Sequence, residues 1–195
     1  MQIHFAVVGG GIVGLASACA LAAVGHTVVV VEQQSPRCLA NCRESVRSTP
    51  TLTQICADWG IGDRLARIST PIDKMTFLDG ETGEELGFIP INKVMDNLPA
   101  DFISVQYGTL FRLFYDLALE RGVQLVFDCQ VVTLDPWQGT LSCKDGRQFT
   151  ADVIIGADGT ESIVRPVVLG PSAPPPEYDN MVTVSYVCSL VNAKC

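Results

Sequence analysis

The amino-terminal part of the chain has two apolar runs separated by a glycine-rich turn and a stretch rich in Ala and Leu. The two runs, residues 3–9 and 26–33, are short and rich in Val, a pattern typical of strands buried in a sheet. Residues 12–25 between them predict a helix that ends at Gly25. A strand, a turn, a helix and a second strand in this order form a βαβ unit and predict a parallel sheet.

The middle of the chain predicts further helices and a hairpin. Apolar positions at helical spacing predict a helix over residues 51–69, with a break at Gly60. Two extended arms around a polar, glycine-bearing turn predict a hairpin over 74–91. Residues 108–122 predict a strongly amphipathic helix that Gly122 ends.

The rest of the chain reads mainly as strands. The predicted strand-like segments are 123–135 (one segment), 139–149 (two short strands around Asp145-Gly146), 151–159 and 181–195. A proline-rich loop precedes the last of them. The pattern as a whole predicts an α/β fold, with a Rossmann-like domain on a parallel sheet and an additional β-meander.

Composition and charge narrow the possible functions. Hydrophobic residues make up 48% and charged residues 17% of the 195 residues, which is typical of a globular domain with a core. The net charge of −8 disfavours nucleic-acid binding, because phosphate binding needs a basic surface. Glycines interrupt the first apolar run, and no basic segment precedes it, so we expect neither a transmembrane span nor a signal peptide.

The cysteines and histidines do not predict a metal site. The chain has 8 Cys and 2 His, and no two cysteines form a CxxC pair. Because no secretory signal is evident, we expect free, mostly buried thiols in a reducing compartment, which points to the cytoplasm.

The first glycine-rich turn fits the GxGxxG pattern at Gly9, Gly11 and Gly14. The first glycine permits the tight turn, the second lets the backbone approach a pyrophosphate, and the third lets the helix pack closely on the strand. The start of the helix, at Ile12 and Val13, offers free N–H groups and a partial positive charge to phosphates. The turn therefore predicts a dinucleotide site.

Glu32 ends the second predicted strand, and Gln33 follows it. A carboxylate at this place can accept hydrogen bonds from the hydroxyls of an adenosine ribose. It also disfavours a 2′-phosphate, so this turn favours FAD or NAD over NADP. The turn by itself leaves the choice between FAD and NAD open.

A second glycine-rich turn follows the predicted strand over 151–159, at Gly156-Ala157-Asp158-Gly159. This stretch resembles the GADGxxSxxR motif of the aromatic-ring hydroxylases, the single-component flavin monooxygenases that include p-hydroxybenzoate and salicylate hydroxylases. The positions that match the motif are Gly156, Asp158, Gly159, Ser162 and Arg165. Apart from the resemblance, Asp158 is also a candidate for a turn residue that caps its own loop.

The resemblance implies that two turns of one sheet hold one extended FAD. It implies NAD(P)H as the reductant and a small organic substrate that is hydroxylated or epoxidised. It places Arg47, before a proline and a helix that ends in Trp-Gly-Ile, near the cofactor. It puts Tyr107, with Gln106 beside it, where the family has a flavin-contacting arginine. No acid or base catalyst is predicted, because the flavin carries the difficult chemistry. The candidate cofactor-binding residues are Gly9, Gly11, Ile12, Val13, Gly14, Glu32, Gln33, Arg47, Gln106, Val131, Asp158 and Gly159.

The resemblance covers only the amino-terminal half of that family, whose later glycine-aspartate motif has no counterpart here. We expect an FAD-binding domain over 1–170, in which 71–100 begins the substrate-binding sheet, and a loop and a truncated strand over 171–195. Two alternatives remain at this point. One is an NAD-dependent dehydrogenase or reductase, and the other is a non-catalytic remnant of a flavin monooxygenase.

Overall fold

The computed structural model describes residues 1–96, 98 and 100–170. The proline-rich loop and the strand predicted over 181–195 lie outside these residues. Within them the chain divides into two compact units, one of residues 1–42 with 111–170 and one of residues 43–110. Each unit is described here by itself. In the described part of the chain, we find no helix with the length and apolar character that a membrane span requires.

The first unit is built on a parallel sheet of four strands in the order β12-β1-β2-β8. The strands are β1 (His4–Val8), β2 (Thr27–Val31), β8 (Gln124–Val126) and β12 (Val153–Gly156). Helix α1 (Ile12–Ala23) connects β1 to β2 and completes the predicted βαβ unit. The parallel α/β architecture expected from the sequence is confirmed.

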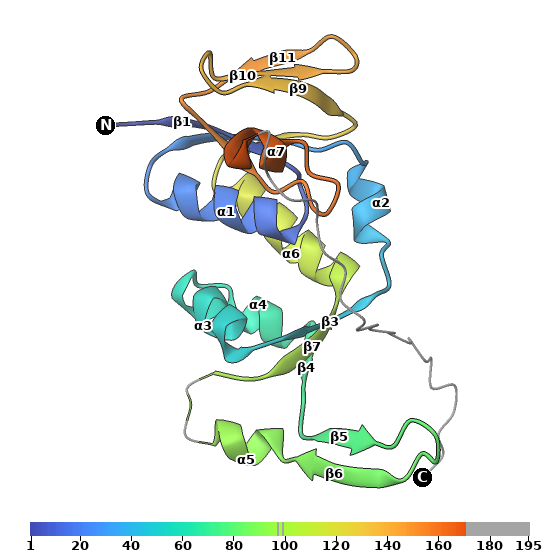
Figure 1. The fold of residues 1–195 in the computed structure, drawn as a ribbon. Helices are drawn as coiled ribbons and strands as arrows, with labels where there is room; N and C mark the ends of the chain where they lie inside the picture. The colour runs from blue at the N-terminus through green and yellow to red at the C-terminus, as the bar shows by residue number, and fades with distance from the viewer. Residues whose placement is uncertain (97, 99, 171–195) are drawn as a thin grey trace. The chain divides into compact units, whose positions relative to one another are not determined.

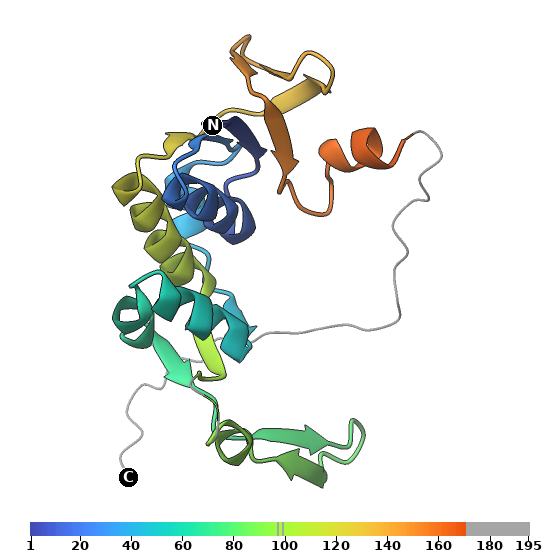
Figure 2. The ribbon, with the colours of Figure 1, turned by 90° about the vertical axis from the view of Figure 1, so that its left-hand side faces the viewer.

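Both faces of this sheet are covered, which explains the unbroken run of Val in β2. On one face α1 packs with helix α6 (Tyr107–Glu120), and the two helices lie side by side in Figures 1 and 2. The Cys19 thiol of α1 lies 3.8 Å from the Phe114 carbonyl oxygen of α6. The predicted amphipathic helix is thus confirmed, and it ends before Gly122, whose φ is +71°.

An antiparallel meander covers the other face. Its strands are β9 (Val131–Asp135), β10 (Thr140–Cys143) and β11 (Gln148–Thr150), in the order β11-β10-β9. The short helix α7 (Val164–Leu169) packs there through the buried Val164. The shared core contains Ala6, Val8, Val29, Val31, Cys129, Val131, Leu141, Cys143 and Val164.

The strand-like segment 123–135 does contain strands, but as two separate ones. The segment forms two strands in different sheets, because β8 pairs with β2 while β9 pairs with β10. The chain turns between them at Asp128, whose φ of 53° is in the left-handed region. One straight strand could not reach both partners, so tertiary pairing overrides the continuous strand pattern.

The second unit contains a small antiparallel sheet, two helices and a hairpin. The sheet has the order β3-β7-β4, with β3 (Ser45–Ser48), β4 (Ser69–Pro71) and β7 (Ile103–Gln106). Helices α3 (Pro50–Asp58) and α4 (Gly62–Ala66) confirm the predicted helical segment and its break at Gly60. Strands β5 (Met75–Leu78) and β6 (Glu85–Ile89) confirm the predicted hairpin. The sequence did not predict β3, β4, β7 or the short helices α2 (Pro36–Ala40), α5 (Ile91–Met95) and α7.

The described cysteines predict a graded reactivity toward thiol reagents. Cys38 is exposed, whereas burial raises the pKa of Cys19 and of Cys56 to about 11 and that of Cys143 to about 12. Only the thiolate reacts, so we expect iodoacetamide at pH 8 to label Cys38 first and to leave these three thiols intact in the native chain. Peptide mapping by mass spectrometry measures this order. Equal labelling of Cys38 and Cys143 before unfolding would contradict the structure.

Candidate dinucleotide-binding site

The two glycine-rich turns meet at the carboxyl edge of the parallel sheet. The Ala157 N–H donates to the Val8 carbonyl at 2.7 Å, and the Gly9 N–H donates to the Val31 carbonyl at 2.9 Å. Gly9 has a φ of +104°, and a Cβ at this residue would lie 2.2 Å from the Ala157 carbonyl oxygen. The structure therefore brings the first turn directly against the second, as two turns that share one ligand require.

Gly14 closes the first turn from the helix side. A Cβ on Gly14 would lie 1.9 Å from the Gly9 carbonyl oxygen, a contact with backbone that no side-chain movement can relieve. This agrees with the role expected for the third glycine of the pattern, which is close packing of the helix on the strand.

The amino-terminus of α1 offers backbone donors to an anion. Its N-cap residue, Gly11, provides no side-chain cap, and its first turn contains no acidic residue. Ile12 is half-buried, and Val13 is 69% exposed. The first N–H groups of a helix lack partners within the helix and carry a partial positive charge, so this end of α1 fits the pyrophosphate of a dinucleotide.

Glu32 is the one buried charged side chain among the described residues, with 8% of its surface exposed. Its two carboxylate oxygens accept hydrogen bonds from the Gly10 N–H and the Gln34 N–H, both at 2.7 Å. These bonds fix the carboxylate beside the first turn. Each oxygen keeps a lone pair, so the carboxylate can still accept hydrogen bonds from ribose hydroxyls. The role of Gly10 was not predicted, although it stands inside the glycine run.

Asp158 is occupied within its own loop. Its carboxylate accepts hydrogen bonds from the Ser162 hydroxyl at 2.6 Å and from the N–H groups of Ile163 and Val164 at 2.8 and 3.2 Å. The Arg165 guanidinium donates to the Thr160 carbonyl of the same loop. The fixed polar positions of the motif therefore hold the loop in shape, and the exposed Gly159, with a φ of +77°, lies at its bend.

The remaining candidates fall into two places. Gln33, the residue after Glu32, is exposed and lines an open groove of about 360 Å³. Val131 is buried in the core, so its backbone rather than its side chain fits a contact with a cofactor. Arg47 and Gln106 belong to the second unit, where they lie exposed on the neighbouring strands β3 and β7.

Comparisons with known proteins agree with this geometry. The FAD-binding domain family matches residues 2–175. A flavin-dependent monooxygenase, eupH, from Phoma sp is 33% identical over 190 residues, covering 92% of this chain and 43% of that protein. The 2,6-dihydroxypyridine 3-monooxygenase of Paenarthrobacter nicotinovorans is 30% identical over 180 residues, covering 92% of this chain and 42% of that protein.

A solved structure shares the fold. PqsL, a probable FAD-dependent monooxygenase from Pseudomonas aeruginosa, superposes with a TM-score of 0.71 at 24% sequence identity, covering 91% of this chain and 48% of that chain. The present chain thus spans less than half the length of each of these proteins. Because the family model matches nearly all of the described residues, the chain belongs to the FAD-binding domain family, and FAD is its cofactor.

Proposed function

We propose that this chain supplies the nucleotide-binding part of an FAD-dependent monooxygenase that acts on a small aromatic substrate. The observation that carries the proposal is the contact between the two glycine-rich turns, with the Glu32 carboxylate held beside the first of them. When bound, the flavin accepts electrons from NAD(P)H and activates O₂, so that one oxygen atom enters the substrate and the other leaves as water.

The residues of this chain bind and orient the cofactor. The N–H groups at the start of α1, around Ile12 and Val13, hold the pyrophosphate, and the Glu32 carboxylate accepts hydrogen bonds from the adenosine ribose. Asp158 and Gly159 shape the second turn, so that its backbone closes the pyrophosphate site from the adjacent strand. Arg47 and Gln106, which the family resemblance suggests, stay proposed cofactor-binding residues, and Val131 is proposed to contact the cofactor through its backbone.

The proposed substrate class comes from the name of a relative. The name of the Paenarthrobacter relative specifies a pyridine ring with two hydroxyl groups, which is a small aromatic compound. We extend this substrate class, but no particular compound, to the proposed monooxygenase. The hairpin β5–β6, within residues 71–100, is proposed to begin the substrate-binding sheet.

The free thiols of the described cysteines support a reducing compartment such as the cytoplasm.

A direct binding experiment tests the cofactor assignment. We expect the purified chain to quench the fluorescence of added FAD with a stoichiometry of one, and a large excess of NAD⁺ to leave this binding unchanged. The two turns share one pyrophosphate, whereas a dehydrogenase would need only the first. Isothermal titration with each nucleotide measures both affinities. Tight binding of NAD⁺ without any binding of FAD would replace the proposal with the dehydrogenase alternative.

A further inference from the structure

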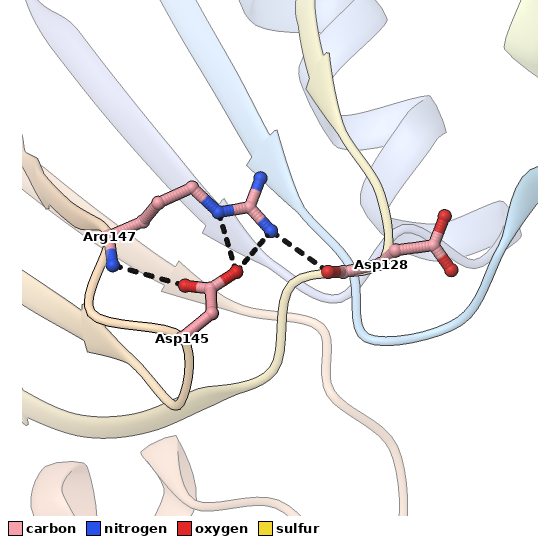
Figure 3. Close-up of polar contacts among 3 residues, drawn as sticks. All are labelled: Asp128, Asp145 and Arg147. Atoms are coloured by element: carbon pink, nitrogen blue, oxygen red, sulfur yellow. Dashed lines mark hydrogen bonds and ion pairs between the residues drawn. The ribbon is translucent and has the colours of Figure 1, made fainter.

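Arg147, in the turn between β10 and β11, joins two segments that are distant in sequence (Figure 3). Its Nε donates to Asp145 Oδ2 at 2.7 Å, and its Nη2 lies 2.6 Å from the same oxygen. The same Nη2 also donates to the Asp128 carbonyl oxygen at 2.8 Å. The Asp145 contact lies within the turn, but the Asp128 contact reaches across to the loop between β8 and β9. The planar guanidinium is suited to making both at once.

The carboxylate of Asp145 keeps this arrangement charged. The hydrogen bond from the Arg147 side chain, together with the bond from its backbone N–H at 3.0 Å, holds the pKa of Asp145 below its ordinary value. The ion pair with Asp145 and the hydrogen bond to the Asp128 carbonyl together fix the orientation of the Arg147 side chain. Both side chains are partly exposed, at 43% for Arg147 and 45% for Asp145.

Asp128 needs such support because its backbone is in an unfavourable conformation. Its φ of 53° is the one positive φ outside glycine among the described residues, and the left-handed region costs free energy for such a residue. In this conformation the Asp128 N–H donates to the Gln34 carbonyl at 3.3 Å, and the next residue, Cys129, donates to the Glu32 carbonyl at 2.9 Å. The loop thus holds the backbone on either side of Gln33.

These contacts form a continuous chain of hydrogen bonds to the nucleotide site. Arg147 holds Asp128, the loop of Asp128 and Cys129 holds the backbone of Glu32, and the Glu32 carboxylate holds the Gly10 N–H. The same loop and turn, together with Gln33, also line the open groove of about 360 Å³. Its lining residues are Gln33, Asp128, Gln130, Lys144 and Asp145.

We propose that Arg147 is a positioning residue for the adenosine end of FAD, which fixes the loop at Asp128 and thereby the ribose-binding carboxylate and the walls of the groove. The proposal rests on the proposed FAD site. Arg147 itself does not contact the ligand in this arrangement. Its removal therefore affects ligands that contain adenosine and spares a flavin that lacks it.

The variant Arg147→Met tests this assignment on the full chain. We expect it to weaken the binding of FAD and of ADP by the same factor, about fivefold to twentyfold, with little change for FMN. FAD and FMN are titrated by flavin fluorescence, and ADP by displacement of FAD or by calorimetry. Arg147→Lys keeps the charge but loses the planar fork, so we expect it to recover only a small part of the lost affinity.

Two controls separate positioning from general effects. Arg67→Gln removes one positive charge from an exposed side chain that donates to the Asp63 carbonyl in α4, and we expect wild-type affinities for it. Asp145→Asn weakens the ion pair but leaves the contact between Arg147 and the Asp128 carbonyl, so its effect on FAD is expected to be smaller than that of Arg147→Met. Thermal unfolding of each variant confirms that it is folded.

The outcomes distinguish this proposal from the proposed function. Unchanged FAD affinity in Arg147→Met overturns the positioning role, and so does an equal loss for FAD and FMN, which indicates general damage to the site. A wild-type chain that binds ADP but not FAD contradicts the proposed function instead, and the ADP affinities of the variants then still decide the role of Arg147.

Discussion

Replacing Gly14 with alanine should weaken FAD binding about a hundredfold and lower the free energy of unfolding by about 1–3 kcal/mol. The added Cβ would lie 1.9 Å from the Gly9 carbonyl oxygen. Since this neighbour is backbone, α1 has to move away from the turn between β1 and α1. That movement displaces the N–H groups at the start of α1, which are the donors proposed to hold the pyrophosphate.

The matched control for this substitution is Gly80→Ala, because a Cβ on Gly80 has nothing within 4 Å. Flavin fluorescence gives the dissociation constant of FAD, and chemical denaturation gives the free energy of unfolding. We expect Gly80→Ala to behave as the wild type in both measurements. Wild-type FAD affinity in Gly14→Ala would show that the helix does not need to approach the turn this closely, and would remove the main support for a pyrophosphate site there.

The sequence predicted those parts of the fold in which local and long-range preferences agree. The Val-rich run of β2 is buried on both faces, and the helix of α1 begins directly after a glycine turn, so pattern and environment coincide. The same agreement holds for the hairpin β5–β6, whose polar turn is flanked by two extended arms.

The failures occur where an element depends on a distant partner. The break at Asp128 has no local signal, because it arises from the pairing of the segments on its two sides with different partners, β8 with β2 and β9 with β10. Strands β3 and β4 are only 4 and 3 residues long and exist through their pairing with β7. Segments of this length are too short for a periodic pattern to identify them.

The candidate site divides in the same way. The glycine pattern and the position of Glu32 could be predicted from the sequence, because the backbone geometry of the turn restricts which residues fit at these positions. The contact between Arg147 and the Asp128 carbonyl could not be predicted. Every residue has a backbone carbonyl, so the type of residue at position 128 does not indicate that its carbonyl accepts a hydrogen bond. For Asp158 the sequence allowed two roles, a contact with the ligand and the capping of its own loop. In the structure its carboxylate accepts hydrogen bonds from its own loop.

The hydrogen bonds to the Asp158 carboxylate indicate how the second turn acts on a ligand. A carboxylate with three donors from its own loop acts on a ligand mainly through the backbone that it holds in place. Glu32 differs, because each of its two carboxylate oxygens accepts only one hydrogen bond, from Gly10 in the first turn and from Gln34 beyond β2. Of the two acids, Glu32 is therefore the one whose side chain is expected to bind FAD directly.

The variant Glu32→Gln is accordingly expected to weaken FAD binding about thirtyfold to a hundredfold and to destabilise the fold by about 1–3 kcal/mol. Both carboxylate oxygens accept a backbone N–H at 2.7 Å, from Gly10 and from Gln34. A glutamine has one oxygen and one NH₂ group, so in either orientation one buried N–H faces another donor. The ribose also loses one of its two acceptors.

Glu85→Gln, the same change at an exposed position on β6, is the control and should leave both FAD affinity and stability unchanged. Comparing FAD with FMN in Glu32→Gln locates the effect, since only FAD carries the adenosine ribose. A loss that is much larger for FAD than for FMN assigns the carboxylate to the ribose. If Glu32→Gln lowers stability but leaves FAD affinity at the wild-type value, the carboxylate serves only to hold the first turn in place. Other groups must then bind the ribose, and Gln33, which lines the groove, is the first residue to test by substitution.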